Sequence, residues 1–363
     1  MASRWLAVDK TLFITTLTLL AIGMVMVYSA SFPASEQHWG HDKHYLLKQS
    51  AWAVLGLTLL LACLLIDYRH YRNPLVVGGA LAGALGALVL VFLVPAAGGV
   101  HRWLYIGGQS MQPSEVAKLV VVLFLAYYLA RKEDRINELW SGLLPCAAVV
   151  GFIVLLIGME PDLGTAGLVT AVTGVMLWVA GISWKYLTRF AGATMLLATL
   201  QIVNSGYQSR RITAFIDPWG NADDAGFQTV QSLIAVATGG LTGVGLGDGK
   251  QKLFYLPHPH TDFIYAVVAE ELGFVGALVV LVGFMMILWR GLRAALRAPD
   301  RFGFYLGIGL TTLLVIQAAV NMSVVLNLLP ITGIPLPLIS YGGSSLLVSC
   351  VALGVLLNVS QHA

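Results

Sequence analysis

Long apolar runs separated by short polar stretches dominate this chain of 363 residues. A helix that crosses a bilayer needs roughly 20 mostly apolar residues, and ten runs approach that length. The runs cover approximately residues 11–31, 48–66, 74–97, 114–130, 143–159, 163–181, 185–203, 263–289, 302–327 and 340–361. The pattern therefore predicts an all-α polytopic membrane protein, in which a bundle of about ten transmembrane helices forms one domain over residues 1–363.

Composition supports the membrane assignment and excludes two large classes of protein. Charged residues make up 11% of the chain and apolar residues 58%, whereas soluble domains carry about a quarter charged residues. Soluble enzymes are therefore excluded, and a net charge of only +3 without a basic stripe excludes nucleic-acid binding. The first run has some features of a signal peptide, but nine further runs favour an uncleaved first helix.

Basic residues are distributed unequally between the two sides of the predicted bundle. Ten spans place both termini on one side, and the connections on that side carry thirteen of the 21 Lys and Arg residues, against seven on the other. Lysine and arginine are concentrated on the cytoplasmic side of membrane proteins, so we expect both termini in the cytoplasm. The outward side then includes a long loop of approximately residues 204–262, whose aromatic and aliphatic residues predict short helices or re-entrant pieces on the bundle.

The long loop ends in the sequence His260-Thr261-Asp262, directly before an apolar run. A carboxylate at this membrane boundary is partly desolvated, which raises its proton affinity and suits it to general-base chemistry. The alternative is structural, because Asp or Thr before a helix often accepts the free N–H groups of its first turn as an N-cap. Glu270 and Glu271 follow within the same apolar run, where one of them must face the bundle or pair with a base.

Further charged clusters lie at the outward ends of other runs. Glu115 and Lys118 are three residues apart and so are neighbours on one helix face, either as a buried ion pair or as one wall of a polar cavity. Glu160 and Asp162 frame a tight turn that could also hold a cation or position a partner. Spacing alone does not decide between the structural and the functional interpretation of either cluster.

Three further features of the sequence point to a ligand site or to a cavity wall. The Arg210-Arg211 pair opens the long loop and suits bidentate binding of phosphate or pyrophosphate oxygens. A glycine-rich run from Gly239 to Gly249 would let backbone approach a ligand closely. Three prolines between residues 330 and 337 predict a broken or re-entrant segment before the last helix. Such backbone is tolerated at membrane depth only where it is buried or lines a cavity, so we expect a cavity wall here.

These clusters, taken in order, resemble the SEDS family (shape, elongation, division, sporulation) of the FtsW/RodA type over essentially the whole chain. The resemblance rests on Gln112-Pro113-Ser114-Glu115 with Lys118, Glu160 to Thr165, Arg210-Arg211-Ile212 with Asp217-Pro218, Gln231-Ser232, His260 to Ile264 with Glu270-Glu271, and Pro335 to Ser345. The stretch from Gly226 to Ser232 and the pair Gln251-Lys252 are more similar to the division branch (FtsW) than to the elongation branch (RodA). One position departs from the family pattern, since His258 stands where the family usually has Glu.

The resemblance implies a peptidoglycan glycosyltransferase in the bacterial cytoplasmic membrane, which polymerises lipid II into glycan strands at the outer face during division or elongation. It implies Asp262 as the catalytic residue, which would take the proton from the attacking sugar hydroxyl. The growing negative charge on the pyrophosphate leaving group needs cations, for which Arg102, Lys118, Arg210 and Arg211 are the candidates. The sequence specifies no cofactor, although a divalent cation, Mg²⁺ or Mn²⁺, could assist at the pyrophosphate.

We expect other polar residues of the same motifs to line or support the cavity around this site. They are Glu115, Glu160, Asp162, His260, Thr261, Glu271, Ser340, Tyr341 and Ser344. His38, His41 and His44 follow HxxHxxH spacing, and His258 and His260 flank a proline. Neither set has a helical Glu partner or Cys ligands, so no zinc site and no protein metal ligands are predicted.

The resemblance also implies partners: lipid II as substrate, a class B penicillin-binding protein as the transpeptidase, other divisome or elongasome membrane proteins, and membrane lipid. The main alternative is a lipid II flippase, because a broken segment near the last span is typical of transporters. Against a flippase, no inverted repeat is apparent, and the ionisable residues gather on the outer face. A non-enzymatic scaffold would have no use for outward carboxylates and paired arginines.

Overall fold

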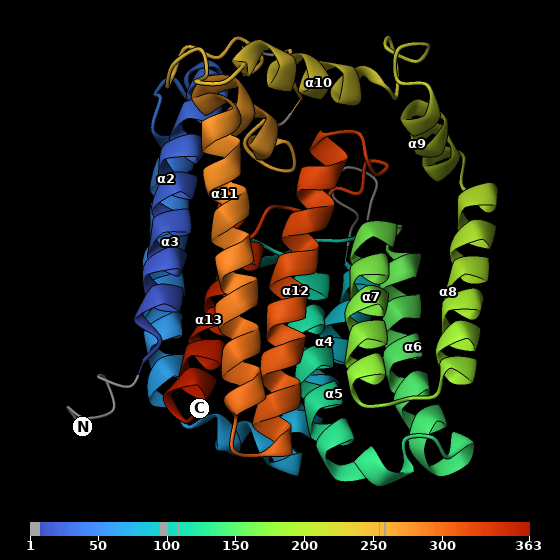
Figure 1. Cartoon of the computed structure of the whole chain (residues 1–363). Helices are drawn as coiled ribbons and strands as arrows, with labels where there is room; N and C mark the ends of the chain where they lie inside the picture. Colours follow the sequence, from blue (N-terminus) through green and yellow to red (C-terminus); the bar gives the residue numbers. More distant parts are fainter. Residues whose placement is uncertain (1–7, 95–100, 107–108, 254, 258) are drawn as a thin grey trace.

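The computed structural model of the chain describes residues 8–94, 101–106, 109–253, 255–257 and 259–363. Ten of its helices coincide with the ten apolar runs (Figure 1). They are α2 (Lys10–Trp39), α3 (His44–Leu65), α4 (Pro74–Leu93), α5 (Pro113–Lys132), α6 (Leu144–Met159), α7 (Leu163–Val179), α8 (Trp184–Asn204), α11 (Ile264–Arg297), α12 (Arg301–Val325) and α13 (Gly343–Gln361). Within the described residues, nine are long and apolar enough to cross a membrane, and α7 is shorter, with 17 residues. The predicted all-α polytopic architecture is confirmed.

Local sequence explains how several of these helices begin. Asn73 accepts the N–H of Leu75, and Pro74 occupies the first position of α4. Asp300 accepts the N–H of Gly303 at the start of α12. Both arrangements satisfy N–H groups that the first turn of a helix leaves without a partner. Short helical turns form two of the connections between spans. η1 (Tyr68–Arg72) connects α3 to α4, and η2 (Glu133–Arg135) and η3 (Leu139–Leu143) connect α5 to α6.

Two helices extend beyond the limits that hydrophobicity predicted. α2 continues through Pro33 to Trp39, and α11 continues to Arg297. α11 also contains a kink at Gly273, where φ is 66°. A β-carbon at Gly273 would lie 2.3 Å from the main-chain nitrogen of Gly243, so both the left-handed backbone and the close approach of the outer loop require glycine. Residues 95–97, which the sequence assigned to the third span, lie outside the described residues.

The core of the bundle lies around α5, α12 and α13. In their most apolar stretches 67%, 72% and 72% of the residues are buried within the chain, whereas no residue of the corresponding stretch of α8 is buried. α3 packs against α13 so closely that a β-carbon at Gly354 would lie 2.6 Å from the carbonyl oxygen of Leu60. Small residues allow this approach between membrane helices. α8 lies at the margin of the bundle, beside α7 (Figure 1).

The start of α2 and the end of α13 lie at the same end of the bundle. The main-chain N–H of Asp9 donates to the hydroxyl of Ser360 (3.4 Å), and the Asp9 carboxylate is 2.6 Å from the guanidinium of Arg290 at the end of α11. Ten crossings predict this arrangement, because an even number of spans returns the chain to the side where it began.

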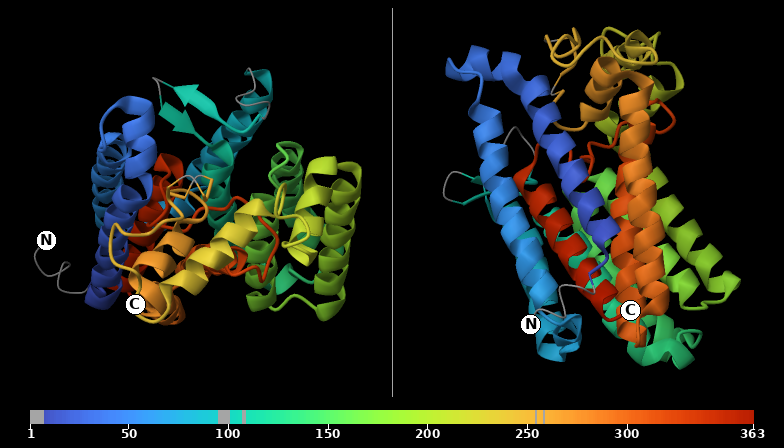
Figure 2. Two further views of the ribbon diagram at one scale, coloured as in Figure 1. Left: turned by 90° about the horizontal axis from the view of Figure 1, so that it is seen from above. Right: turned by 60° about the vertical axis from the view of Figure 1, so that its left-hand side comes forward.

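The other end of the bundle carries most of the remaining structure (Figures 1 and 2). A short antiparallel hairpin is formed by β1 (Leu104–Ile106) and β2 (Gln109–Met111). The long loop contains two helices, α9 (Gly206–Ile216) above α8 and α10 (Phe227–Gly239), which crosses the top of the bundle. The prediction of short helices lying on the bundle is confirmed for this loop.

Residues 326–342, between α12 and α13, contain no helix and pass through the interior. Leu338 has a φ of 65°, and a β-carbon at Gly23 of α2 would lie 2.4 Å from its carbonyl oxygen. On the other side, a β-carbon at Gly164 of α7 would lie 2.8 Å from the carbonyl oxygen of Thr332. This segment, called the re-entrant segment below, is therefore held between α2 and α7, and it contains no helix, as its prolines predicted.

Candidate active site

The turn that carries Asp262 is fixed through its main chain at the three carbonyl oxygens of residues 260–262. The N–H of Tyr341 donates to the first (2.8 Å), the hydroxyl of Ser340 to the second (2.7 Å) and the side-chain amide of Asn321 to the third (2.7 Å). All three donors come from α12 or the re-entrant segment. These hydrogen bonds hold the main chain in place. They therefore fix the position of the Asp262 Cα, from which the half-buried side chain extends.

Asp262 is not the N-cap that the sequence left open as an alternative. α11 begins at Ile264, and Phe263 occupies the N-cap position. The Asp262 carboxylate instead lies near Gly333 of the re-entrant segment, where a β-carbon would be 3.4 Å from Oδ2 and where φ is 76°. Since the helix start does not use this carboxylate, the geometry accommodates the general-base interpretation.

Aromatic side chains support the same turn. The ring of Tyr45 in α3 packs against those of His260 and Tyr341, with centroids 4.7 and 5.2 Å apart, and the last two rings are 5.5 Å apart. Gln49, one helical turn after Tyr45, donates its amide N–H to the carbonyl oxygen of Ser340 (3.2 Å). The predicted residues of the loop end and of the re-entrant segment are thus brought together.

Two amides of α12 that the sequence analysis did not identify hold the re-entrant segment. Asn321 also donates to the carbonyl oxygen of Ile334 (2.9 Å), and Gln317 donates to that of Pro335 (2.9 Å). The two amides are four residues apart, so they share one face of a buried helix. A pair of amides at this spacing in an apolar run is the signal that would have revealed them, because polar side chains in a membrane helix need partners.

Lys118 does not occupy the position predicted for it as a pyrophosphate ligand. Its side chain has 0% exposure, and its ammonium lies 2.8 Å from a Glu115 carboxylate oxygen and 2.8 Å from the Gln317 amide oxygen. The structure therefore favours the buried ion pair, which here joins α5 to α12. At the outward end of α5, the N–H of Gln112 donates to the hydroxyl of Ser344 (3.2 Å), which attaches α5 to the start of α13.

The turn between α6 and α7 gathers Arg102, Glu160 and Asp162. The Arg102 guanidinium donates to the carbonyl oxygens of Glu160 (2.7 Å) and of the next residue. Asp162 caps α7 by accepting the N–H of Thr165 (3.1 Å), and it accepts the Gln112 amide (3.0 Å). Glu160 is fully buried, and burial together with the charge of Asp162 raises its pKa to about 8, although Arg102 acts in the opposite direction.

Arg211 of α9 supplies a second guanidinium at the outward end of the re-entrant segment. It donates to the carbonyl oxygen of Ile331 (3.0 Å) and to the hydroxyl of Tyr207. The guanidinium also lies over the Tyr207 ring, 4.5 Å from its centroid, in a cation–π contact. These contacts are with neutral groups, so the positive charge of Arg211 is not neutralised by them.

The pKa of Arg211 is affected by charges on the Asp262 turn and on the α6–α7 turn. Burial lowers the pKa of Arg211, the positive charge of Arg102 acts in the same direction, and the negative charges of Asp262 and Asp162 oppose them. Arg210 is exposed, because neighbouring residues on a helix point about 100° apart. Arg102 and Arg211 therefore lie within electrostatic reach of each other and of the site carboxylates, whereas the role predicted for Arg210 at the pyrophosphate stays a prediction.

Glu271 belongs to a separate buried network at the outer end of α2 and α11. Its carboxylate accepts from the Lys252 ammonium (2.6 Å) and from the hydroxyl of Ser29 (2.6 and 2.8 Å). Glu270 accepts the main-chain N–H of Lys250 (2.8 Å). The Glu271 carboxylate also accepts the N–H of Gly247 (3.1 Å). The two carboxylates therefore hold the glycine-rich run and the residues that follow it, and Glu271 pairs with a base, which is one of the two possibilities that the sequence left open.

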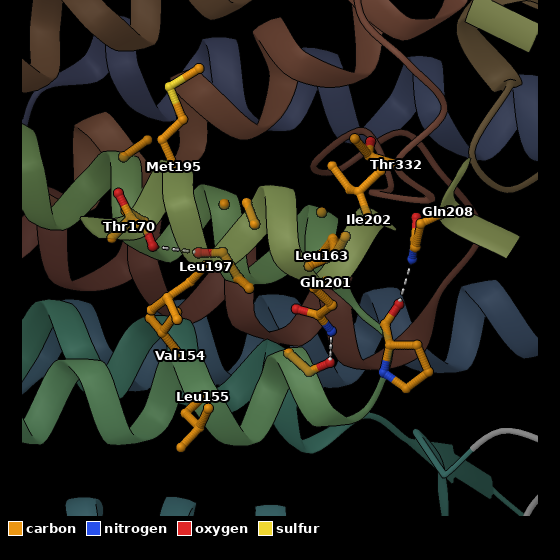
Figure 3. Close-up of a pocket in the computed structure, with 18 of the residues that line it drawn as sticks. Val154, Leu155, Leu163, Thr170, Met195, Leu197, Gln201, Ile202, Gln208 and Thr332 are labelled. Atoms are coloured by element: carbon orange, nitrogen blue, oxygen red, sulfur yellow. Dashed lines mark hydrogen bonds between the residues drawn. The ribbon is translucent and has the colours of Figure 1, made fainter. Parts of the chain in front are cut away.

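A large apolar cavity lies beside the candidate site, between α6, α7, α8, α9 and the re-entrant segment (Figure 3). Its volume is about 730 Å³. Most of its lining is aliphatic, and its polar lining includes Gln201, Gln208 and Arg211. Figure 3 shows the first two donating to main-chain carbonyl oxygens of the α6–α7 turn region, those of Gly158 and Pro161. The cavity can therefore hold hydrocarbon next to the charged cluster.

In the part of the chain that the structure describes, no group of three His, Cys, Asp or Glu side chains could hold a metal ion. The divalent cation considered at the pyrophosphate stays a prediction. His258, the position that departs from the family pattern, lies outside the described residues.

Sequence comparison identifies the family. The model of the FtsW/RodA/SpoVE family, described as "Cell cycle protein", matches residues 10–363. The chain belongs to this family. The probable peptidoglycan glycosyltransferase FtsW of Geobacter metallireducens is 41% identical over 358 residues, 98% of this chain and 95% of that protein. Stage V sporulation protein E of Bacillus subtilis is 39% identical over 368 residues, which cover the full length of both proteins.

Two solved structures share the fold of this FtsW/RodA/SpoVE member. One, described as "Structural coordination of polymerization and crosslinking by a peptidoglycan synthase complex", matches with a TM-score of 0.81 and 30% identity over 98% of both chains. The other, RodA of Thermus thermophilus, matches with a TM-score of 0.73 and 29% identity over 98% of this chain and 97% of that one. The resemblance to the SEDS family is confirmed.

Proposed function

We propose that this protein polymerises lipid II, with Asp262 as general base and with Arg102 and Arg211 as the cations that face the pyrophosphate leaving group. Peptidoglycan glycosyltransferase activity is the function that the family and the curated relatives support. The observation that supports the residue assignment is the position of Asp262. It stands on a turn anchored at three successive carbonyl oxygens and within electrostatic reach of Arg211.

The reaction joins a sugar hydroxyl of one substrate to the anomeric carbon of the other, and the bond from that carbon to the lipid pyrophosphate breaks. As the new C–O bond forms, the hydroxyl proton passes to the Asp262 carboxylate. Negative charge develops on the departing pyrophosphate, where guanidinium groups stabilise it. A guanidinium has five N–H donors, and the contacts of Arg102 and Arg211 with neutral oxygens use only part of them.

The apolar cavity between α6 and α9 suits the hydrocarbon of a lipid-linked substrate. Its lining is mainly aliphatic, and Arg211 contributes to the same wall. A polyprenyl chain in this cavity would therefore place its pyrophosphate next to the guanidinium groups. Burial of such a chain stabilises binding by about 25 cal/mol for each Å² of apolar surface.

We further propose that the end of the bundle with α9 and α10 faces outward from the bacterial cytoplasmic membrane. The opposite end carries most of the Lys and Arg residues, which marks a cytoplasmic side. A class B penicillin-binding protein would then assemble with this protein, because one structural relative is described as a peptidoglycan synthase complex that coordinates polymerisation and crosslinking. Other divisome or elongasome membrane proteins are further candidate partners.

The test is glycan synthesis from fluorescent lipid II by the full chain purified with its cognate transpeptidase. The Asp262→Asn variant should fold and bind the partner, yet synthesise glycan at least about 100-fold more slowly, as expected for loss of a general base. Asp223→Asn is the matched control, because Asp223 is an exposed carboxylate of the same loop. Glycan made at the normal rate by Asp262→Asn would contradict the assignment of the base.

The same preparation separates polymerisation from transport. In liposomes, transbilayer movement of fluorescent lipid II without any glycan product would support the flippase and contradict the polymerase. Glycan formed by the wild type and lost only in the Asp262 variant would support the proposal.

A further inference from the structure

Glu160 is a buried acid, and the proposed reaction assigns no role to it. The residue has 0% exposure, and neither carboxylate oxygen has a hydrogen-bond partner among the described residues. An ionised carboxylate in such surroundings is strongly disfavoured, because it has lost water and gained no donor. Most buried side-chain polar atoms in proteins are hydrogen-bonded, so two orphaned oxygens on one side chain require an explanation.

The charged groups around Glu160 come from three segments. The charges of Asp162, in the same turn, and of Arg102, before β1, act on Glu160 directly. Arg211 in α9 does not act on Glu160 directly among the described interactions, but it is reached by the charges of both Asp162 and Arg102. The neighbouring ring of His101 is directed to the carbonyl oxygens of Val91 and Val94 and so does not contact Glu160 through its Nδ1.

The Arg102 guanidinium lies against this turn without pairing with its acid. It donates to main-chain carbonyl oxygens on either side of the peptide bond after Glu160. In the described part of the chain, no carboxylate oxygen lies within 4.0 Å of the Arg102 guanidinium. A neutral Glu160 therefore leaves the full positive charge of Arg102 to act on a ligand, whereas an ionised Glu160 would neutralise part of it.

We propose that Glu160 is a positioning residue that acts as a neutral carboxylic acid, so that the Arg102–Arg211 pair keeps its charge for the pyrophosphate of a lipid-linked substrate, and that its ionisation weakens this binding. The inference rests on the proposed function, since it assigns a further role within the same site. It also explains why the side chain is buried without donors, because donors would stabilise the ionised form.

The sign of the pH dependence follows from the direction of the shift. Burial and the charge of Asp162 raise the pKa of Glu160 to about 8, so the acid is neutral below that pH and ionises above it. If the ionised form binds pyrophosphate poorly, the dissociation constant rises by about tenfold from pH 7 to pH 9, since the neutral fraction falls from about 0.9 to about 0.09.

The experiment measures binding of undecaprenyl pyrophosphate to the full chain in nanodiscs between about pH 7 and pH 9. Glu160→Gln keeps the shape and the neutral charge but cannot ionise. It should bind within about twofold of wild type at pH 7, and should lose the weakening above pH 8. Glu160→Met, also neutral, provides the same test if the amide disturbs folding, and Asp223→Asn, which removes an exposed charge from the outer loop, should keep the wild-type profile. Ionisation of the ligand itself affects all four proteins equally.

Three results would overturn the inference. Retention of the alkaline weakening in both Glu160 variants would assign it to another group. Equal wild-type affinity at pH 7 and pH 9 would show that ionisation of Glu160 does not reach the ligand. Loss of binding at pH 7 in a folded Glu160→Gln protein would show that the ionised form is required. Failure of the wild type to make glycan while binding still follows Glu160 would contradict only the proposed polymerase function.

Discussion

The buried network of Glu271, Lys252 and Ser29 joins the long outer loop to two helices at once. Both ionic side chains are at most 1% exposed and their charged atoms are 2.6 Å apart. The Lys252 ammonium also donates to Ser29 (3.1 Å) and to the carbonyl oxygen of Gly247 (2.6 Å). With an effective dielectric constant of about 20, two unit charges at this separation attract by about 6 kcal/mol. The desolvation of both groups offsets much of that energy.

Removal of one partner should therefore cost more than removal of both. Lys252→Met leaves the Glu271 carboxylate buried without its cation, and Glu271→Gln leaves the ammonium without its anion. Each single substitution is expected to destabilise the protein by about 3–5 kcal/mol, whereas the double variant has no unpaired charge and should be closer to wild type. The corresponding coupling energy would exceed about 2 kcal/mol.

The native cysteines provide the assay. Cys146 and Cys350 are buried and Cys63 is partly buried, so a thiol-reactive fluorophore reports the exposure of the core on heating in detergent. At roughly 2 °C for each kcal/mol, each single variant should lower Tm by about 6–10 °C. Lys250→Met is the matched control, because this lysine is two residues away in the same loop and is exposed. Additive effects in the double variant, or a Tm unchanged by Lys252→Met, would refute the reasoning.

Three further predictions concern the turn of Asp262 and its support. Asn321→Leu removes the two hydrogen bonds by which this amide links the carbonyl oxygen of Asp262 to that of Ile334, and buried carbonyls left unpaired cost about 1–3 kcal/mol each. The kcat for glycan synthesis should fall at least about tenfold with little change in KM, and an unchanged kcat would contradict the role of the amide. Gly333→Ala places a β-carbon at a φ of 76° and 3.4 Å from the Asp262 carboxylate. The free energy of unfolding should fall by about 1–2 kcal/mol, measured by thermal unfolding, and kcat should also fall. Wild-type values for both quantities would show that the segment relaxes freely. Gly23→Ala would place a β-carbon 2.4 Å from a main-chain oxygen of the re-entrant segment, and we expect a lower yield of folded protein by size-exclusion chromatography, which Gly78→Ala, with open space at the same atom, should not show.

Hydrophobic runs predicted the helices well because a bilayer imposes length and composition on every span. The predicted run at residues 302–327, for example, is α12 (Arg301–Val325) almost to the residue. The kink of α11 at Gly273 was not predictable, since its cause is the approach of Gly243 from the outer loop. A single sequence shows which residues are apolar, but it does not show which loop will press against a helix.

For the candidate site, the sequence identified motifs that the structure brings together, but it did not show which of their residues interact. Adjacency suggested that Arg210 and Arg211 act together, yet the helix of α9 turns them apart, and the cation whose charge acts on Arg211 is Arg102, from a distant segment. The spacing of Glu115 and Lys118 placed them on one helix face, and the structure shows the ion pair that was one of the two interpretations left open. The neutral amides that hold the re-entrant segment carry no charge and no motif, so tertiary contacts alone reveal their role.

The anchoring of the Asp262 turn has a consequence for biosynthesis. The hydroxyl that holds the carbonyl oxygen of Thr261 belongs to Ser340, 79 residues later in the chain. At translation rates of about 5–20 residues per second, the ribosome needs about 4–16 s after it has made the carboxylate before it makes the residue that fixes it. A nascent chain halted before its last span would therefore carry the proposed base into the membrane without the hydrogen bonds that fix its turn, so we expect activity only when translation is nearly finished.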